Sequence, residues 1–124
     1  MTGLRVFVVD DEEPARRKLV RLLADDGGCL LVGEAASGEE AVHRIAAARP
    51  DLLFLDVQMK RMNGLDVARA LDPASPPRIV FVTAYDEYAL EAFDVHAFDY
   101  LLKPFDRTRF ARVLADIRRT MSQE

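Results

Sequence analysis

The sequence predicts an α/β domain in which one parallel sheet is covered by helices on both faces. Five short apolar runs alternate with segments of helical periodicity, the pattern of repeated βα units. Three runs, residues 4–9, 52–55 and 79–82, are almost continuously apolar, as expected of strands that are covered on both faces. The length of 124 residues suits one domain, so we expect a single domain over residues 1–124, with a polar end at about 120–124.

The first half of the chain carries clear boundary signals. Residues 12–25 have helical spacing and stop at an Asp-Asp-Gly-Gly sequence, after which residues 30–35 form the second apolar run. Ser37 is followed three residues later by Glu40, the spacing of a capping box that opens a helix over about residues 38–48.

The second half continues the alternation. Asn63-Gly64 predicts the start of a helix that reaches about residue 71, before a proline-rich loop over residues 72–77. The later elements are expected as follows: a strand at 79–82, a helix near 86–94, a strand near 98–102 and a last helix from Asp106. The last helix has an apolar stripe at helical spacing.

The polarity of the strands indicates their order in the sheet. The runs at 30–35 and 98–102 carry Glu34 and Asp99, so they suit the two edges. A five-strand order of 2-1-3-4-5 places both there, with the three apolar strands between them. We therefore expect a flavodoxin-like, doubly wound (βα)5 sheet.

Composition limits the classes of function. The net charge of −4 and the isoelectric point near 5.2 argue against electrostatic nucleic-acid binding by this segment. The single cysteine, Cys29, cannot form an internal disulfide, which fits a reducing cytoplasm. The sequence contains no apolar stretch of membrane-spanning length. We expect a cytoplasmic domain without a membrane partner.

Chemically reactive residues follow four of the five apolar runs. These residues are Asp10 and Asp11, Asp56, Thr83, and Lys103. Because the carboxyl ends of parallel strands lie at one edge of a sheet, where open α/β sheets bind ligands, we expect these side chains to meet there. Any one of them alone is better explained as a cap, a turn residue or a surface charge, and Asp11 is expected also to cap the following helix. The joint occurrence at separate strand ends favours a reaction site.

Three clustered carboxylates predict a cation. At ~5 Å and an effective dielectric constant of ~20, each pair of acids repels by ~3 kcal/mol. Lys103 supplies one positive charge, and Mg²⁺ suits the remainder because it binds few carboxylates and works beside phosphate oxygens. A carboxylate nucleophile with these neighbours suits phosphoryl transfer to Asp56, with Thr83 donating a hydrogen bond to a phosphoryl oxygen.

The same motifs resemble the receiver domain of bacterial response regulators over essentially the whole chain. The residues that carry the resemblance are Val-Val-Asp-Asp-Glu at 8–12, Leu-Asp-Val-Gln-Met at 55–59, Val-Thr-Ala at 82–84 and Leu-Lys-Pro-Phe at 102–105. The resemblance implies these roles: Asp56 as phosphoacceptor, Asp10 and Asp11 as the acidic pair for Mg²⁺, the backbone carbonyl of Gln58 as a further metal ligand, Thr83 as switch hydroxyl, and Tyr100 as switch aromatic. It also implies a cis peptide bond between Lys103 and Pro104.

Residues 85–93 and 99–105 resemble the LytR/AlgR branch of receivers, whose members usually carry a C-terminal LytTR DNA-binding domain. Such a domain is absent from these 124 residues. The resemblance implies a signalling switch that catalyses only its own phosphorylation and dephosphorylation, with a histidine kinase or phosphotransfer protein as partner. Seven of the ten aromatic residues lie in residues 85–110, so we expect a homodimer through the helix near 86–94, the strand near 98–102 and the last helix.

Three other functions are considered. A haloacid-dehalogenase-type phosphohydrolase normally has a second Asp two residues after its nucleophile, where this chain has Gln58. An FMN-binding module is disfavoured because the acidic strand ends would repel the FMN phosphate and the chain has no Trp to stack on the ring. A pseudo-receiver, which only mediates interactions, is disfavoured because the acidic, Thr and Lys set is complete.

Overall fold

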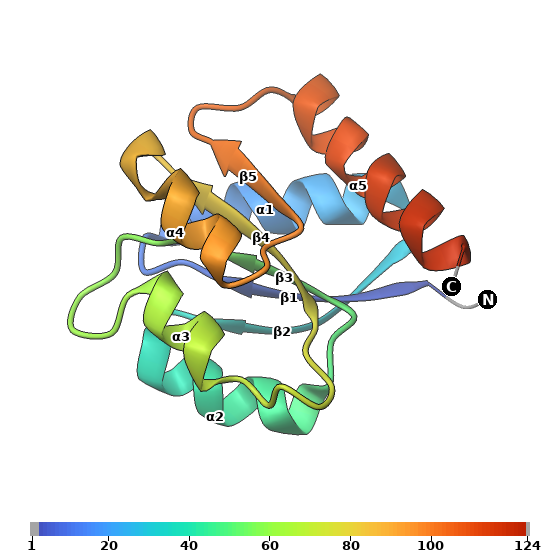
Figure 1. Ribbon diagram of the computed structural model, residues 1–124. Helices are drawn as coiled ribbons and strands as arrows, with labels where there is room; N and C mark the ends of the chain where they lie inside the picture. The colour runs from blue at the N-terminus through green and yellow to red at the C-terminus, as the bar shows by residue number, and fades with distance from the viewer. Residues whose placement is uncertain (1–2, 124) are drawn as a thin grey trace.

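The structure is a computed structural model that describes residues 3–123, apart from the side chain of Leu90. Five parallel strands form one sheet in the order β2-β1-β3-β4-β5, which confirms the predicted doubly wound fold (Figure 1). The strands are β1 (Leu4–Val9), β2 (Cys29–Ala35), β3 (Leu52–Leu55), β4 (Arg78–Thr83) and β5 (Asp99–Leu102). The strands with Glu34 and Asp99 are the edges, as predicted.

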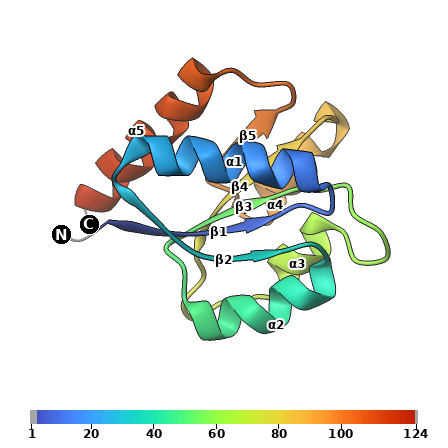
Figure 2. The same ribbon diagram turned by 180° about the vertical axis from the view of Figure 1, so that it is seen from behind.

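Helices cover both faces of this sheet. They are α1 (Glu13–Asp26), α2 (Gly38–Ala48), α3 (Gly64–Ala70), α4 (Ala89–Asp94) and α5 (Arg107–Ser122). Figures 1 and 2 show α1 and α5 on one face and α2 and α3 on the other. Ala92 of α4 packs in the same buried cluster as the α2 and α3 residues. No helix in residues 3–123 is long and apolar enough to cross a membrane.

The core is divided by the sheet into two layers. Alternate residues of one strand point to opposite faces, so Phe54 packs with α1 and α5, whereas Leu53 and Leu55 pack with α2 and α3. The ring of Phe54 stacks on that of Phe110 of α5, with centroids 5.4 Å apart. Each of these side chains is almost completely buried, so both faces supply the hydrophobic free energy that keeps the central strands in place.

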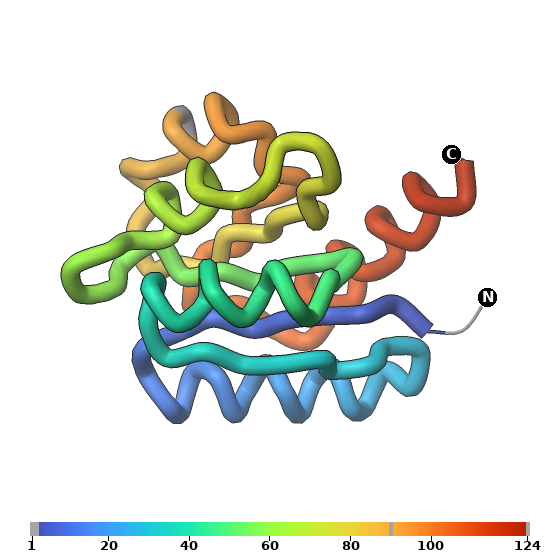
Figure 3. The backbone as a smooth tube through the Cα atoms, turned by 90° about the horizontal axis from the view of Figure 1, so that it is seen from below, coloured from blue at the N-terminus to red at the C-terminus, as the bar shows by residue number. Residues whose placement is uncertain are grey.

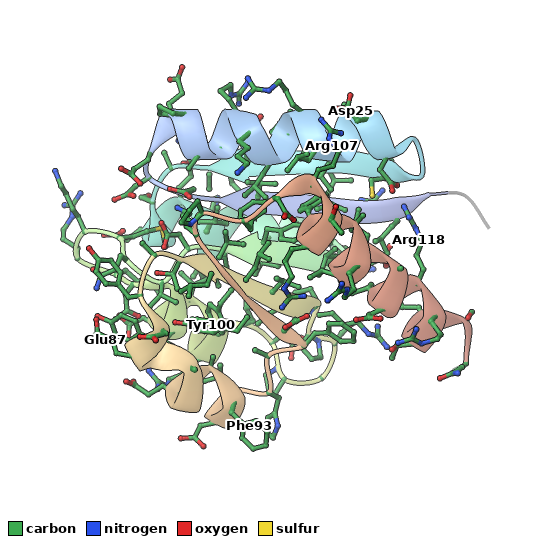
Figure 4. The ribbon with its side chains drawn as sticks, turned by 90° about the horizontal axis from the view of Figure 1, so that it is seen from above. Asp25, Glu87, Phe93, Tyr100, Arg107 and Arg118 are labelled. Atoms are coloured by element: carbon green, nitrogen blue, oxygen red, sulfur yellow. The ribbon has the colours of Figure 1, made fainter. Side chains whose placement is uncertain are left out.

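Ion pairs also join α1 to α5. Arg107 lies 3.1 Å from Asp25, and both side chains are labelled in Figure 4. Arg118, also labelled there, pairs with Asp26. The start of β1 and the end of α5 lie at the same end of the sheet (Figures 1 and 3). The carboxyl edge, at the opposite end, is where β1 leads into α1.

Two predicted caps are wrong in detail. Asp11 does not cap α1: the N-cap is Glu12, and no side chain makes the capping hydrogen bond. The Ser37 hydroxyl accepts from the amide of Glu40 at 3.2 Å, but the Glu40 carboxylate accepts from the amide of Ala36 instead of that of Ser37. The predicted box is therefore only half formed.

Two other boundaries also differ from the prediction. The segment near 86–94 divides into a 3₁₀ turn, η1 (Asp86–Tyr88), and the short helix α4. The helix α5 continues through Ser122, so residues 120–122 of the predicted polar end are helical, while Glu124 lies outside the described residues. Asp106, the predicted start of the last helix, is the N-cap of α5, and its carboxylate accepts from the amide of Arg109 at 2.8 Å.

Candidate functional site

The acids predicted to meet at the carboxyl edge do so. Oxygen atoms from Asp10, Asp11 and Asp56 all lie within 4.8 Å of one another. Asp10, Asp56 and Thr83 are the buried polar side chains of the described chain, with exposures of 0%, 5% and 0%. A cavity of about 690 Å³ is lined by Asp56 and Thr83, and by Asp11 and Lys103. Buried negative charges are unfavourable without a positive partner, and the cavity gives a ligand access to these acids.

The end of β1 holds Asp10 rigidly. Its amide donates to the carbonyl of Ala35 in β2 at 3.2 Å, and its carboxylate accepts from the amide of Glu12 at 2.9 Å. The other carboxylate oxygen lies 2.9 Å from the Lys103 ammonium. Asp11, the next residue, is exposed at the mouth of the cavity.

Asp56 follows β3, the central strand, so it lies in the middle of the site. Its amide donates to the carbonyl of Val9 at 3.0 Å, which continues the pairing of β1 and β3. One carboxylate oxygen accepts from the amide of Gln58 at 3.0 Å, and the other lies 3.3 Å from the Lys103 ammonium. Burial raises the pKa of Asp56 to about 6, because the positive charge of Lys103 opposes the effect only in part and the negative charge of Asp10 adds to it.

Lys103 reaches the acids from the end of β5. The Lys103–Pro104 bond is cis, as the resemblance implies, and the Lys103 amide donates to the carbonyl of Thr83 at 2.8 Å. Burial lowers the pKa of the ammonium, but the hydrogen bond to Asp10 and the charge of Asp56 outweigh it, so the pKa lies above its ordinary value. Lys103 is therefore charged at neutral pH and joins two of the acids.

The remaining predicted residues lie around the cavity. Thr83, the last residue of β4, accepts from the amide of Tyr85 at 3.4 Å. The Gln58 side-chain amide donates to the Tyr88 hydroxyl at 2.6 Å, which links the loop after β3 to η1. The Tyr100 hydroxyl donates to the carbonyl of Tyr85, and its half-buried ring, labelled in Figure 4, lies 6.4 Å from that of Phe81 between ring centroids. Burial raises the pKa of this phenol.

The basic residues of α1 support the site through contacts that the sequence does not indicate. Arg16 and Arg17 both pair with Glu34 of β2. Lys18 donates to the carbonyl of Phe105 at 2.8 Å, and its ammonium lies 4.2 Å from the centroid of that ring. A run of charges on a helix carries no sequence signal for such contacts, because strand β2 and the loop after β5 reach α1 only in the folded chain.

The geometry agrees with comparison to known families. Residues 6–115 match the response regulator receiver domain. The chain belongs to this family. It is the receiver domain of a two-component response regulator, a signalling switch and not a metabolic enzyme, so the hydrolase and FMN-module alternatives are wrong.

The curated relatives are longer than this chain. An uncharacterized response regulatory protein of Yersinia pestis is 52% identical over 118 residues, which cover 95% of this chain and 50% of that protein. The transcriptional regulatory protein BtsR of Escherichia coli is 46% identical over 121 residues, covering 98% of this chain and 51% of BtsR. The chain thus spans about half the length of the curated relatives that it matches.

Solved structures agree over nearly the full chain. The response regulatory domain of mrkE from Klebsiella pneumoniae is 31% identical, with a TM-score of 0.91, over 98% of this chain and 100% of that domain. The receiver domain of AraT from Geobacillus stearothermophilus is 32% identical, with a TM-score of 0.87, over 99% and 98% of the two chains.

Proposed function

We propose that this receiver accepts a phosphoryl group on Asp56 in a Mg²⁺-dependent reaction. The observation that carries the proposal is the position of the Asp56 carboxylate, which borders the cavity 3.3 Å from the Lys103 ammonium and beside two more acids. The donor is a phosphohistidine of a histidine kinase or phosphotransfer protein, the partners with which receiver domains interact.

Each residue of the site has a separate role in the proposed transfer. A carboxylate oxygen of Asp56 bonds to phosphorus while the bond from phosphorus to the donor nitrogen breaks, and the imidazole remains with the donor. The Lys103 ammonium, held at the site by Asp10, neutralises negative charge on the transferred group. The Thr83 hydroxyl donates to one of its oxygens. The pKa of Asp56, about 6, leaves the carboxylate ionised and nucleophilic at neutral pH.

The acids also fit the magnesium ion. Their hard oxygen atoms are the ligands that Mg²⁺ prefers, and three clustered carboxylates with a single lysine retain excess negative charge. Asp10, Asp11, Asp56 and the backbone carbonyl of Gln58 would hold the ion. When bound, Mg²⁺ supplies positive charge for the oxygens of the transferred group.

Phosphorylation changes the surface around Tyr100. In this proposal the Thr83 hydroxyl moves toward the phosphoryl group, which alters its contact with the amide of Tyr85. Because the Tyr100 hydroxyl donates to the carbonyl of the same residue, a shift of Tyr85 also changes the environment of that phenol. Thr83 and Tyr100 are thus the switch residues.

We further propose that residues 1–124 act as the receiver half of a LytTR-type transcriptional regulator. The support is the longer transcriptional relative BtsR together with the LytR/AlgR-like motifs. A homodimer through α4, β5 and α5 is the proposed output of phosphorylation, since Phe93 of α4 is 80% exposed and Leu102 of β5 is 44% exposed. Figure 4 shows Phe93 at the outer side of α4.

The charges of this face make most of their contacts within the chain. Asp99 pairs with Arg109 at 3.3 Å, and Arg119 with Asp116 at 2.8 Å. These side chains are therefore less available for ion pairs between two copies of the chain. The exposed apolar side chains are the stronger support for association.

The test is phosphorylation by acetyl phosphate, read by intact mass. Wild type with Mg²⁺ should gain one phosphoryl group, and the adduct should be absent in EDTA and in Asp56→Asn. Asp94→Asn, which changes an exposed acid of α4, serves as the matched control and should be phosphorylated as wild type is. An adduct that persists in Asp56→Asn would show that Asp56 is not the acceptor.

A further inference from the structure

Arg16 connects α1 to the backbone of the acidic pair. Its guanidinium donates through Nη1 to the carbonyl oxygen of Asp10 at 2.9 Å. Only 15% of the side chain is exposed, and its Nε lies 3.5 Å from the Glu34 carboxylate. A charged donor that is mostly buried makes a stronger hydrogen bond than a solvated one, so this contact restrains the carbonyl.

The carbonyl of Asp10 belongs to the peptide unit that leads into Asp11. Because the peptide is planar, an anchor on its oxygen also sets the direction in which the chain enters Asp11. Asp10 has further anchors, since its carboxylate is held by the amide of Glu12 and by Lys103. No described hydrogen bond or ion pair in residues 3–123 holds the carboxylate of Asp11. Its place beside the other acids therefore depends on the backbone that Arg16 restrains.

The charge of Arg16 does not by itself favour a cation in the site. A guanidinium near a cation repels it, and removing the guanidinium would strengthen cation binding if charge alone decided. Glu34, which pairs with both Arg16 and Arg17, offsets part of this repulsion. The electrostatic and positional effects of Arg16 thus have opposite signs, which makes them separable by experiment.

We propose that Arg16 is a positioning residue of the magnesium site, which holds the Asp10–Asp11 peptide so that both carboxylates face one ion. This inference rests on the proposed function, because it requires that the acids bind Mg²⁺. Groups that orient metal ligands commonly change metal affinity by 10- to 100-fold when they are removed.

Arg17 provides the matched control. It is the next residue of α1, carries the same charge and pairs with the same Glu34 carboxylate. No described contact joins it to Asp10. A role of Arg16 limited to attaching α1 to β2 would be shared by Arg17, whereas the contact with the Asp10 carbonyl belongs to Arg16.

The experiment is calorimetric titration of the 124-residue chain with MgCl₂ at pH 7.5. Arg16→Met should bind Mg²⁺ about 10-fold more weakly than wild type. Arg17→Met, with the same loss of charge, should bind within about twofold of wild type or more tightly. Urea unfolding of each variant in EDTA measures stability without the metal. Both variants lose a pair with Glu34, and Arg16→Met should have the lower midpoint because it also loses the part-buried hydrogen bond to the Asp10 carbonyl.

If a methionine variant fails to fold, the Mg²⁺ affinities can be compared in lysine variants of Arg16 and Arg17. Arg16→Lys keeps the positive charge but lacks the planar fork that reaches both partners, so it should bind Mg²⁺ more weakly than Arg17→Lys. Equal affinities in the Arg16 and Arg17 variants would overturn the positioning role while leaving the proposed function intact. A wild-type chain that does not bind Mg²⁺ would overturn both.

Discussion

Substitution of Asp56 by Asn should stabilise the domain at pH 7.5 in the absence of divalent cations. The carboxylate is 5% exposed and lies near Asp10, so the folded chain holds an unfavourable charge there. An amide removes that charge while its oxygen can still accept from the amide of Gln58. Lys103 loses one carboxylate but keeps its hydrogen bond of 2.9 Å to Asp10.

The magnitude follows from the pKa of Asp56. Folding raises this pKa from 3.8 to about 6, and each unit is worth ~1.4 kcal/mol, so the charged carboxylate costs up to ~3 kcal/mol of folding free energy. The folded state binds more protons than the unfolded state between pH 4 and 6. Stability therefore falls as the pH rises through that window, and the full cost is present above pH 6. This cost already includes the pairing with Lys103. We expect a net gain of about 1–3 kcal/mol, because the buried amide of Asn itself needs hydrogen-bond partners.

Urea unfolding followed by circular dichroism measures this gain. With a slope of roughly 2 kcal/mol per molar urea, the midpoint of Asp56→Asn should exceed that of wild type by about 0.5–1.5 M at pH 7.5 in EDTA. The difference should fall to about a third at pH 4.5, where the carboxyl of Asp56 is protonated in the folded chain. Asp11→Asn, a change of an exposed acid in the same cluster, should shift the midpoint less.

Two results would refute this reasoning. A midpoint of Asp56→Asn equal to or below that of wild type at pH 7.5 would mean that the pairing with Lys103 outweighs the burial of the charge. An undiminished gain at pH 4.5 would mean that the effect does not arise from ionisation of Asp56. Saturating Mg²⁺ should reduce the difference in urea midpoint between Asp56→Asn and wild type, because the ion stabilises wild type through all three acids.

Two further predictions concern the surface and the cysteine. Phe93→Ser should leave a beryllofluoride-treated chain monomeric in sedimentation at concentrations where treated wild type forms dimers, because the 80% exposed ring is lost from the contact face; equal dimerisation of both would contradict that face. Burial, together with the negative charge of Asp26, raises the pKa of the Cys29 thiol to about 11. Iodoacetamide should therefore alkylate Cys29 at pH 8 on the order of 100-fold more slowly than the thiol of a small cysteine peptide, and alkylation should be faster in Asp26→Asn. Alkylation of wild type at the rate of the peptide would contradict the raised pKa.

The order of the strands and the place of the site were predictable from local patterns. Glu34 and Asp99 identified the edge strands, and continuous apolar runs identified the central ones. A central strand lies between two other strands and is covered by helices on both faces, whereas an edge strand is partly open to solvent. The site followed from the same pattern, since parallel strands bring their carboxyl ends to one edge whatever their spacing in the chain. Asp10, Asp56 and Lys103 thus met as predicted.

The partners of the charged side chains were decided by packing in three dimensions. Arg16, Arg17 and Lys18 are consecutive cations in the sequence, yet they contact the Asp10 carbonyl, the Glu34 carboxylate and the Phe105 carbonyl. Successive helical residues point about 100° apart, so these contacts depend on how α1 is rotated and tilted on the sheet. The capping of α1 and α2 likewise depended on the path by which the chain enters each helix. The sequence alone therefore determined which strands and acids come together, whereas the folded packing of α1 determined which cations support them.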